Sequence, residues 1–146
     1  MGQRILDTNV LISFWWKCWN ERSRDERTAK GVRNWARDLI KARNSNSVVS
    51  PVVVEFIAGS KNNKDLLLLR AFIEEFDIVD AGVIPREDWQ AAKLRAERIP
   101  RNGKRRDLGD CLILAIADRL HMDVDSLDEG LNRSRTKLRL PKRRRR

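Results

Sequence analysis

Several acidic side chains of this sequence stand beside apolar segments, where an ordinary solvated acid is not expected. Asp7 follows an apolar pair, Glu55 interrupts the apolar segment 52–58, and Asp110 precedes the apolar run 111–117. Carboxylates gathered in one crevice repel each other, by roughly 4 kcal/mol for two charges about 4 Å apart at an effective dielectric constant of about 20. A divalent cation offsets this repulsion, and ligation by oxygen alone selects Mg²⁺ or Mn²⁺ over Zn²⁺. Such an ion activates water and neutralises charge on a phosphate, so these acids predict a site that cleaves phosphodiester bonds.

Asp7 and Glu55 also have structural interpretations. The segment Asp7-Thr8-Asn9 is well suited to capping the helix that follows it, so Asp7 fits either role. Glu55 can lie on the surface of its helix. However, Val52, Phe56 and Gly59 fall on the same side of that helix at spacings of three and four residues, which predicts that Glu55 is at least partly buried.

Asp110 stands in the first turn of an expected helix, where the helix dipole favours a carboxylate. Asp107 is the natural N-cap of that helix, so capping does not require Asp110, although Asp107 stays a second candidate for the site. Asp128 follows an expected strand, as Asp7 does, and Asp125 lies nearby. Other acids on expected helices are interpreted as solvated: Glu74, Glu87 and Asp88.

The pattern of apolar residues predicts alternating strands and helices. Strands are expected over residues 4–6, 47–49, 77–79, 124–127 and 137–140, and helices over 10–19, 25–42, 52–58, 64–75, 85–98 and 108–120. Ser50 is expected to cap its helix ahead of Pro51. In the helix 85–98, the residues expected to face inward are Trp89, Ala92 and Ala96. Strands that alternate with helices indicate an α/β fold with a parallel sheet, whose carboxyl edge is the usual place for a ligand.

The composition excludes several classes of protein. With 146 residues, 41% of them apolar and 36% charged, the chain fits one domain with a proper core. The longest apolar run is far shorter than the roughly 20 residues that a bilayer requires. The two cysteines are too few for a disulfide framework or a zinc site, and the single histidine, His121, counts against a histidine-rich metal site and a histidine-dependent triad. We therefore expect a soluble, cytoplasmic protein that does not bind membranes.

Positive charge is concentrated in two acid-free stretches. Of the 31 Lys and Arg residues, nine lie within 133–146. The full chain has a net charge of +10, but the part outside this stretch is nearly neutral. A second basic stretch, 98–106, directly precedes Asp107. Clustered cations of this kind suit a polyanion such as RNA. The C-terminal stretch also fits a solvated, disordered tail or a segment foreign to the natural chain.

Four segments taken together resemble the PIN domain and, within that superfamily, a VapC-type toxin ribonuclease of a toxin–antitoxin pair. They are Ile5-Leu6-Asp7-Thr8-Asn9-Val10-Leu11-Ile12, Ser50-Pro51-Val52-Val53-Val54-Glu55-Phe56-Ile57-Ala58-Gly59, Asp110-Cys111-Leu112-Ile113-Leu114-Ala115-Ile116-Ala117 and Ser126-Leu127-Asp128. No single segment is specific, but their order and separations match those of the family across nearly the whole chain.

The resemblance implies a three-layer α/β/α domain over residues 1–140, with a central, mainly parallel sheet of four to five strands and a basic tail over 141–146. It also implies a divalent-metal-dependent endoribonuclease that forms a homodimer and binds a small antitoxin. Mg²⁺ or Mn²⁺ would be held by Asp7, Glu55, Asp110 and Asp128. The residues expected to orient these carboxylates or the attacking water are Thr8, Asn9 and Ser126. The residues expected to hold the RNA backbone are Lys104, Arg105, Arg106 and Arg139.

Three tryptophans share one short expected helix. Trp15 and Trp19 are expected to stack at their four-residue spacing, whereas Trp16 lies about 100° around the helix from Trp15. These rings fit the core or a dimer contact. They also fit a partly exposed groove for a helix of the antitoxin, or a surface on which RNA bases stack.

Two other functions fit the same residues. In the first, the protein is a non-catalytic RNA-binding module in which the acids are helix caps. In the second, it is a PIN-type nuclease that acts in RNA maturation outside any toxin system.

Overall fold

The computed structural model of the chain describes residues 3–98 and 108–128. Within them, four strands form one parallel sheet in the order β3-β2-β1-β4. The strands are β1 (Ile5–Leu6), β2 (Ser47–Val48), β3 (Asp77–Ile78) and β4 (Val124–Asp125). The helices are α1 (Thr8–Glu21), α2 (Ala29–Arg43), α3 (Ser50–Ala58), α4 (Asn63–Ile73), α5 (Arg86–Arg98) and α6 (Leu108–Leu120), with a 3₁₀ turn, Arg24–Glu26. The predicted α/β fold with a parallel sheet is confirmed.

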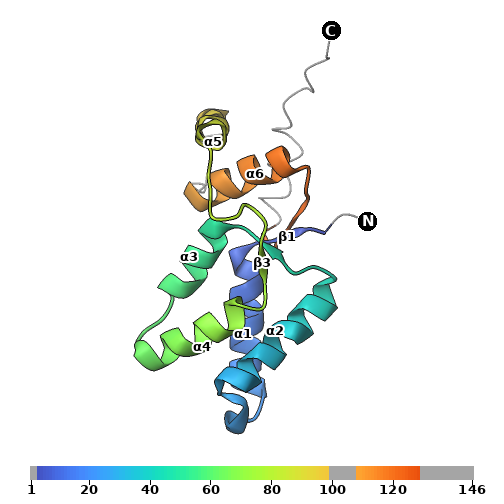
Figure 1. The fold of residues 1–146 in the computed structure, drawn as a ribbon, viewed down its shortest axis with the longest axis vertical. Coiled ribbons are helices and arrows are strands. Elements are labelled where there is room, and N and C mark those ends of the chain that lie inside the picture. Colours follow the sequence, from blue (N-terminus) through green and yellow to red (C-terminus); the bar gives the residue numbers. More distant parts are fainter. Residues whose placement is uncertain (1–2, 99–107, 129–146) are drawn as a thin grey trace.

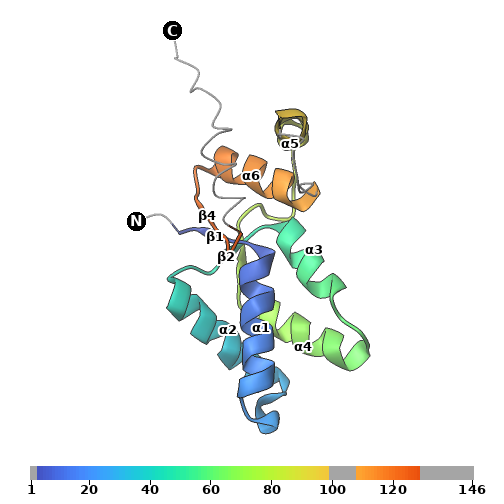
Figure 2. The same cartoon turned by 180° about the vertical axis from the view of Figure 1, so that it is seen from behind.

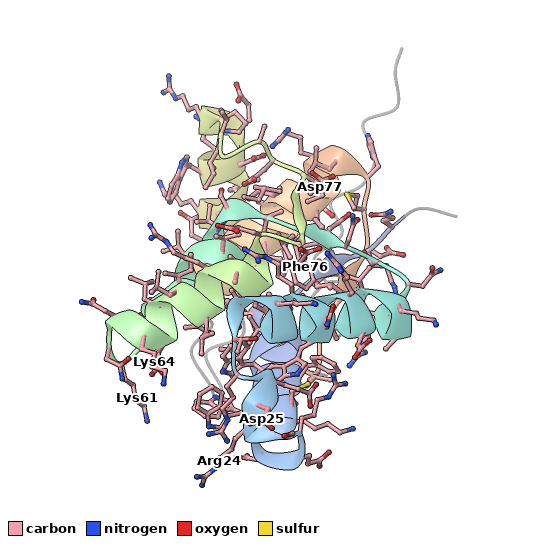
Figure 3. All side chains as sticks on the ribbon, turned by 60° about the horizontal axis from the view of Figure 1, so that its bottom comes forward. Arg24, Asp25, Lys61, Lys64, Phe76 and Asp77 are labelled. Atoms are coloured by element: carbon pink, nitrogen blue, oxygen red, sulfur yellow. The ribbon has the colours of Figure 1, made fainter. Side chains whose placement is uncertain are left out.

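The helices form two layers with the sheet between them. Figure 1 and the reverse view in Figure 2 place α1 to α4 on one side of the strands and α6 on the other, with α5 packed on α6. Figure 3 marks Phe76 and Asp77, where the chain passes from α4 into the edge strand β3. No helix among the described residues has both the length and the apolar character that a membrane crossing requires. The predicted strand 137–140, the tail 141–146 and the basic residues Lys104, Arg105, Arg106 and Arg139 lie outside the described residues, as does Asp107.

The larger core cluster holds α1 beneath the sheet through aromatic contacts. The Trp15 ring meets those of Trp35, Phe56 and Phe72 edge to face, with centroids 5.5, 6.1 and 5.3 Å apart. Such contacts add about 0.5–1.5 kcal/mol each beyond the burial of area. Trp15 also stacks on Trp19 at 6.0 Å, as predicted. These rings lock α1, and with it the residues at its first turn, against α2, α3 and α4.

The central strand β1 pairs with β2 on one side and β4 on the other, with Ile5 opposite both Ser47 and Val124. Beyond the last paired residues, the Asp7 backbone N–H donates to the Asp125 carbonyl at 2.9 Å. Because parallel strands end at the same edge of a sheet, this bond places the segments that follow β1 and β4 side by side. Helix α1 begins at Thr8, two residues earlier than predicted, and so starts at that edge.

Helix α5 lies with a different face inward from the one predicted. Trp89 is 46% exposed and Ala96 is exposed; of the residues predicted to face inward, only Ala92 is buried. Asp88, predicted to be solvated, is 2% exposed. The Nε–H of Arg119 on α6 donates a bifurcated hydrogen bond to the Asp88 carboxylate and lies 3.0 Å from each oxygen, which makes an ion pair. The inward face predicted from the apolar residues of α5 was wrong because ion pairs, rather than the large apolar side chains, determine which face of α5 packs on α6.

The start of α3 also differs from the prediction. Val49 is the N-cap residue, and Ser50 is already helical. The backbone N–H of Ser50 lies 3.0–3.1 Å from the two carboxylate oxygens of Asp80, and its hydroxyl also bonds to that carboxylate. Asp80, which follows β3, thus supplies the capping oxygen that Ser50 was expected to provide. Gly59 ends the helix as predicted.

Candidate active site

Asp7 combines the two roles that its sequence position allows. It is the N-cap of α1, and its Oδ1 accepts a hydrogen bond from the Thr8 N–H at 2.8 Å. Its Oδ2 accepts one from the Ser126 hydroxyl at 2.8 Å. The Asp7 side chain is almost entirely buried, with 5% exposed. A buried carboxylate is stabilised by such donors and by the positive end of the helix dipole, so Asp7 is fixed in place at the carboxyl edge of the sheet.

Ser126 joins the ends of β1 and β4. Its hydroxyl donates to Asp7 and accepts from the Asn9 Nδ2 and from the Asp128 N–H, each at 3.0 Å. Asn9 completes the link, because its Oδ1 accepts from the Leu127 N–H at 3.1 Å. A serine hydroxyl has one proton and two lone pairs, so these contacts use its full capacity. The residues predicted to orient the acids therefore lie together around Asp7.

Thr8 ties Glu55 to the same network. While its backbone N–H donates to Asp7, its hydroxyl donates to the Glu55 Oε2 at 2.8 Å. The two carboxylates, 48 positions apart in sequence, thus bond to one threonine residue. Glu55 is exposed, so the prediction of partial burial was wrong. Val52 and Phe56 face the core, whereas Glu55 lies on the neighbouring face of α3 and reaches the site from solvent.

Asp110 and Asp128 are both partly exposed. Asp110 lies in the first turn of α6, and the preceding residue, Gly109, lines a hollow that Glu55 also lines. Asp128 enters the network through its backbone N–H, which donates to Ser126. The structure thus connects Asp7, Glu55 and the backbone of Asp128 by hydrogen bonds, and brings the first turn of α6 to the hollow beside Glu55. The catalytic role of each acid stays a prediction.

Asp125 turns its carboxylate elsewhere. Its side chain is 7% exposed and is paired with Arg43 at 3.2 Å and with Arg4 at 3.6 Å. Successive residues of a strand point to opposite faces, which separates the Asp125 side chain from that of Ser126. Asp125 therefore contributes to the site only its backbone carbonyl, which holds Asp7.

Asp80 is a buried acid near the site that the sequence analysis missed. Its carboxylate accepts from Ser50 and, at 3.3 Å, from the Gly82 N–H. It thereby anchors the helix that carries Glu55 to the turn after β3, where Ala81 and Gly82 both have positive φ angles. A signal was present in the sequence, because Asp80 follows a β-branched strand as Asp7 follows β1.

The donor set fits a hard divalent cation, since Asp7 and Glu55 offer only oxygen. Among residues 3–98 and 108–128, no three or more His, Cys, Asp or Glu side chains are close enough together to hold a metal ion. Mg²⁺ does not require such a group, because proteins usually bind it through one or two carboxylates while it keeps several waters. Two carboxylates held by the same threonine meet that requirement.

The fold and these contacts define an α/β protein with a hydrogen-bonded set of acids at the carboxyl edge of a parallel sheet. The chain belongs to the PIN-domain family, whose model matches residues 4–136. PIN domains are generally nucleases, and they generally use divalent metal ions. Searches of the curated proteins and of the solved structures found no match.

Proposed function

We propose that the protein is a divalent-metal-dependent endoribonuclease and the toxin of a type II toxin–antitoxin pair. The observation that carries the proposal is the pair of hydrogen bonds that Thr8 donates, from its backbone N–H to Asp7 and from its hydroxyl to Glu55, at 2.8 Å each. It gives a structural reason for two carboxylates to stay together at the edge where α/β proteins bind ligands. The net charge of +10 favours a polyanionic substrate.

In this mechanism Asp7 and Glu55 would hold Mg²⁺ or Mn²⁺, while Asp110 and Asp128 stay the further ligands that the sequence predicts, because no three or more such acids in the described part of the chain are close enough together to hold an ion. The ion supplies an activated water and neutralises charge on the phosphate. Ser126 and the Thr8 N–H fix the orientation of the Asp7 carboxylate, and the Thr8 hydroxyl orients that of Glu55. Asn9 holds Ser126 and the backbone of residue 127 in turn. The RNA backbone binds to Lys104, Arg105, Arg106 and Arg139.

The test is cleavage of total RNA and of structured RNAs in the presence of Mg²⁺, Mn²⁺ or EDTA. The parent chain is compared with the Asp7→Asn variant and with a chain that lacks residues 141–146. For each protein, cleavage of RNA is compared with cleavage of single-stranded DNA. We expect cleavage of RNA that requires a divalent ion and is lost in Asp7→Asn. Undiminished cleavage in Asp7→Asn would remove Asp7 from the site. Binding of RNA without cleavage under any condition would favour the non-catalytic binding module.

A groove beside α1 supports the proposal of a protein partner. It has a volume of about 330 Å³, and its lining includes Trp15, Trp16, Trp19 and Phe56. Trp16 is 44% exposed, and the Lys61 ammonium lies 6.0 Å from the centre of its ring. Figure 3 shows Lys61, in the turn between α3 and α4, and Lys64, in the first turn of α4. An apolar helix with acidic flanks fits such a groove, and an antitoxin that neutralises this basic chain would have that chemistry.

The toxin role predicts that the product of a small reading frame next to this gene co-purifies with the chain and blocks its RNA cleavage. Trp16→Glu should weaken that complex while leaving the chain folded, because the ring is nearly half exposed. Light scattering of the purified chain tests the expected homodimer. RNA cleavage with no such partner would favour a nuclease of RNA maturation.

A further inference from the structure

A hollow of about 630 Å³ adjoins the proposed catalytic acids. We call it the Glu55 hollow. It lies between the start of α3, the first turns of α6 and the segment before α5. Its lining includes Ser50, Pro51, Val54, Glu55, Ile84 and Leu112. Glu55 belongs to both the hollow and the Thr8 link, so a group that occupies the hollow lies next to the acids.

The charge around the hollow argues against a phosphate there. The beginning of a helix usually attracts anions through its free N–H groups. At α3, however, the Ser50 N–H and hydroxyl are both bonded to the Asp80 carboxylate, and residue 51 is a proline, which has no N–H. This end of the hollow therefore already carries a negative charge. The oxygens of Ser50 and Glu55 offer acceptors, and the other described residues of the lining are largely aliphatic.

We propose that the Glu55 hollow receives the nucleobase of a nucleotide adjoining the scissile phosphate of RNA. This inference rests on the proposed ribonuclease function and adds a base-binding subsite to it. A base is flat and uncharged and carries N–H donors on its edge beside its acceptors, so it can place an N–H group against the acceptors on one side of the hollow and its faces against the aliphatic walls. The volume of the hollow lies within the range of small-molecule sites, about 300–1,000 Å³. The phosphate stays outside, toward the ion held by the acids.

Val54 offers a way to close the hollow without disturbing the core. Its side chain lines the hollow and is 66% exposed. In Val54→Trp the larger ring fills the space that the base would take, while Glu55 and the core residues are unchanged. Leu67→Trp is the matched control, because Leu67 on α4 is 64% exposed and does not line the hollow. Both variants should melt at the temperature of the parent chain.

The experiment uses a short single-stranded RNA that the parent chain cleaves, together with versions that each lack one base near the cleavage site. For the parent, we expect loss of one particular base to lower kcat/KM by about tenfold or more, comparable with the loss of one base contact in single-strand binding. Val54→Trp should lower kcat/KM on the intact RNA by a similar factor and respond equally to every abasic position. Leu67→Trp should behave as the parent.

The outcomes separate this inference from the proposed function. If the parent cleaves RNA but no single abasic position matters, or if Val54→Trp keeps the sensitivity of the parent, the base-binding subsite is refuted and the nuclease stands. Parent-like cleavage by Val54→Trp is also the result expected if the hollow accepts a side chain of a partner protein, and it likewise overturns the inference. If the parent cleaves no RNA with either Mg²⁺ or Mn²⁺, the proposed function and the subsite both fall.

Discussion

Two regions of this molecule each hold a buried acid, Asp7 in one and Asp88 in the other, and they do so by different means. The strand-end network consists of Asp7, Thr8, Asn9, Glu55 and Ser126, and it is joined by hydroxyl and amide groups. The α5–α6 interface is joined by ion pairs, which among the described residues include Asp88 with Arg119 and Arg95 with Asp118. Around these pairs the apolar contacts are small, since the buried cluster there consists of Ala92, Cys111, Leu112 and Ala115.

The difference leads to different predictions for the acids of the two regions. At the α5–α6 interface each of the two acids meets an arginine on the facing helix, so the charges help to dock α5 on α6. In the strand-end network, Asp7 and Glu55 bond to the same threonine, although two neighbouring carboxylates repel. If these two acids act together in catalysis, as proposed, their contribution should be to activity rather than to stability. Substitutions in the two regions should therefore affect different properties.

The largest effect is expected for Asp7→Asn in the strand-end network. RNA cleavage should fall by about 10²- to 10⁴-fold, the range for loss of a group that acts at the reacting centre. Stability should change by only about 1 kcal/mol or less, because the amide oxygen of Asn can still accept a hydrogen bond from Thr8 or Ser126. Initial rates with Mg²⁺ and urea unfolding measure the two quantities. A large loss of stability with cleavage retained would make Asp7 a helix cap alone.

Arg119→Met at the α5–α6 interface should show the opposite behaviour. It leaves the Asp88 carboxylate, 3% exposed, without the Arg119 guanidinium, whose side chain is 36% exposed, and a buried group left without its partner costs about 1–3 kcal/mol. The double variant Asp88→Leu/Arg119→Met should recover most of this loss. Urea unfolding tests both, and RNA cleavage per folded molecule should be unchanged.

Lys93→Met is the control on the same helix. Lys93 is 77% exposed, and its ion pair with Glu97 has a distance of 3.8 Å. The loss of such a surface pair should change the unfolding free energy by less than about 0.5 kcal/mol. If Arg119→Met is no more destabilising than Lys93→Met, the ion pairs do not dock α5.

The sequence predicted the strand-end network better than the α5–α6 interface for a physical reason. Asp7 and Ser126 directly follow strands, and pairing of parallel strands brings their ends together whatever the intervening chain does. Asp88 gave no such signal, because an acid in the first turn of a helix is usually solvated. Its burial depends on Arg119, a long side chain 31 residues away whose direction no local pattern specifies.

The same reasoning explains the errors at α3. The burial predicted for Glu55 rested on helical spacing alone, but Val52 and Phe56 already satisfy the core on the neighbouring face. Ser50 was expected to cap its own helix from the local sequence alone. The acceptor that replaces it, Asp80, comes from a different strand end, and no residue near Ser50 in the sequence indicates it. Local patterns thus located the helix and its acid, while tertiary contacts decided their exposure and capping.

A smaller effect, on both RNA cleavage and the free energy of unfolding, is expected for Ser126→Ala. The change removes the donor to Asp7 and the acceptor of Asn9 and of the Asp128 N–H. Groups left unsatisfied cost about 1–3 kcal/mol, and loss of a group that orients a metal ligand typically lowers activity by about 10- to 100-fold. Ser126→Thr keeps the hydroxyl and should recover cleavage. An unchanged rate in Ser126→Ala would show that the hydroxyl does not position Asp7.

The smallest effect is expected for Asp110→Asn in buffer that contains EDTA. Two effects oppose each other: the dipole of α6 favours a carboxylate in its first turn by about 0.3–1 kcal/mol, whereas repulsion from neighbouring acids disfavours it. If Asp110 shares the site with Asp7 and Glu55, the repulsion offsets the dipole, and the melting temperature stays the same or rises. Added Mg²⁺ should then stabilise the parent chain by mass action and the variant much less. Thermal melts with EDTA and with Mg²⁺ give both comparisons; a fall of many degrees in EDTA would instead make Asp110 a structural residue of α6, as Asp88 is of α5.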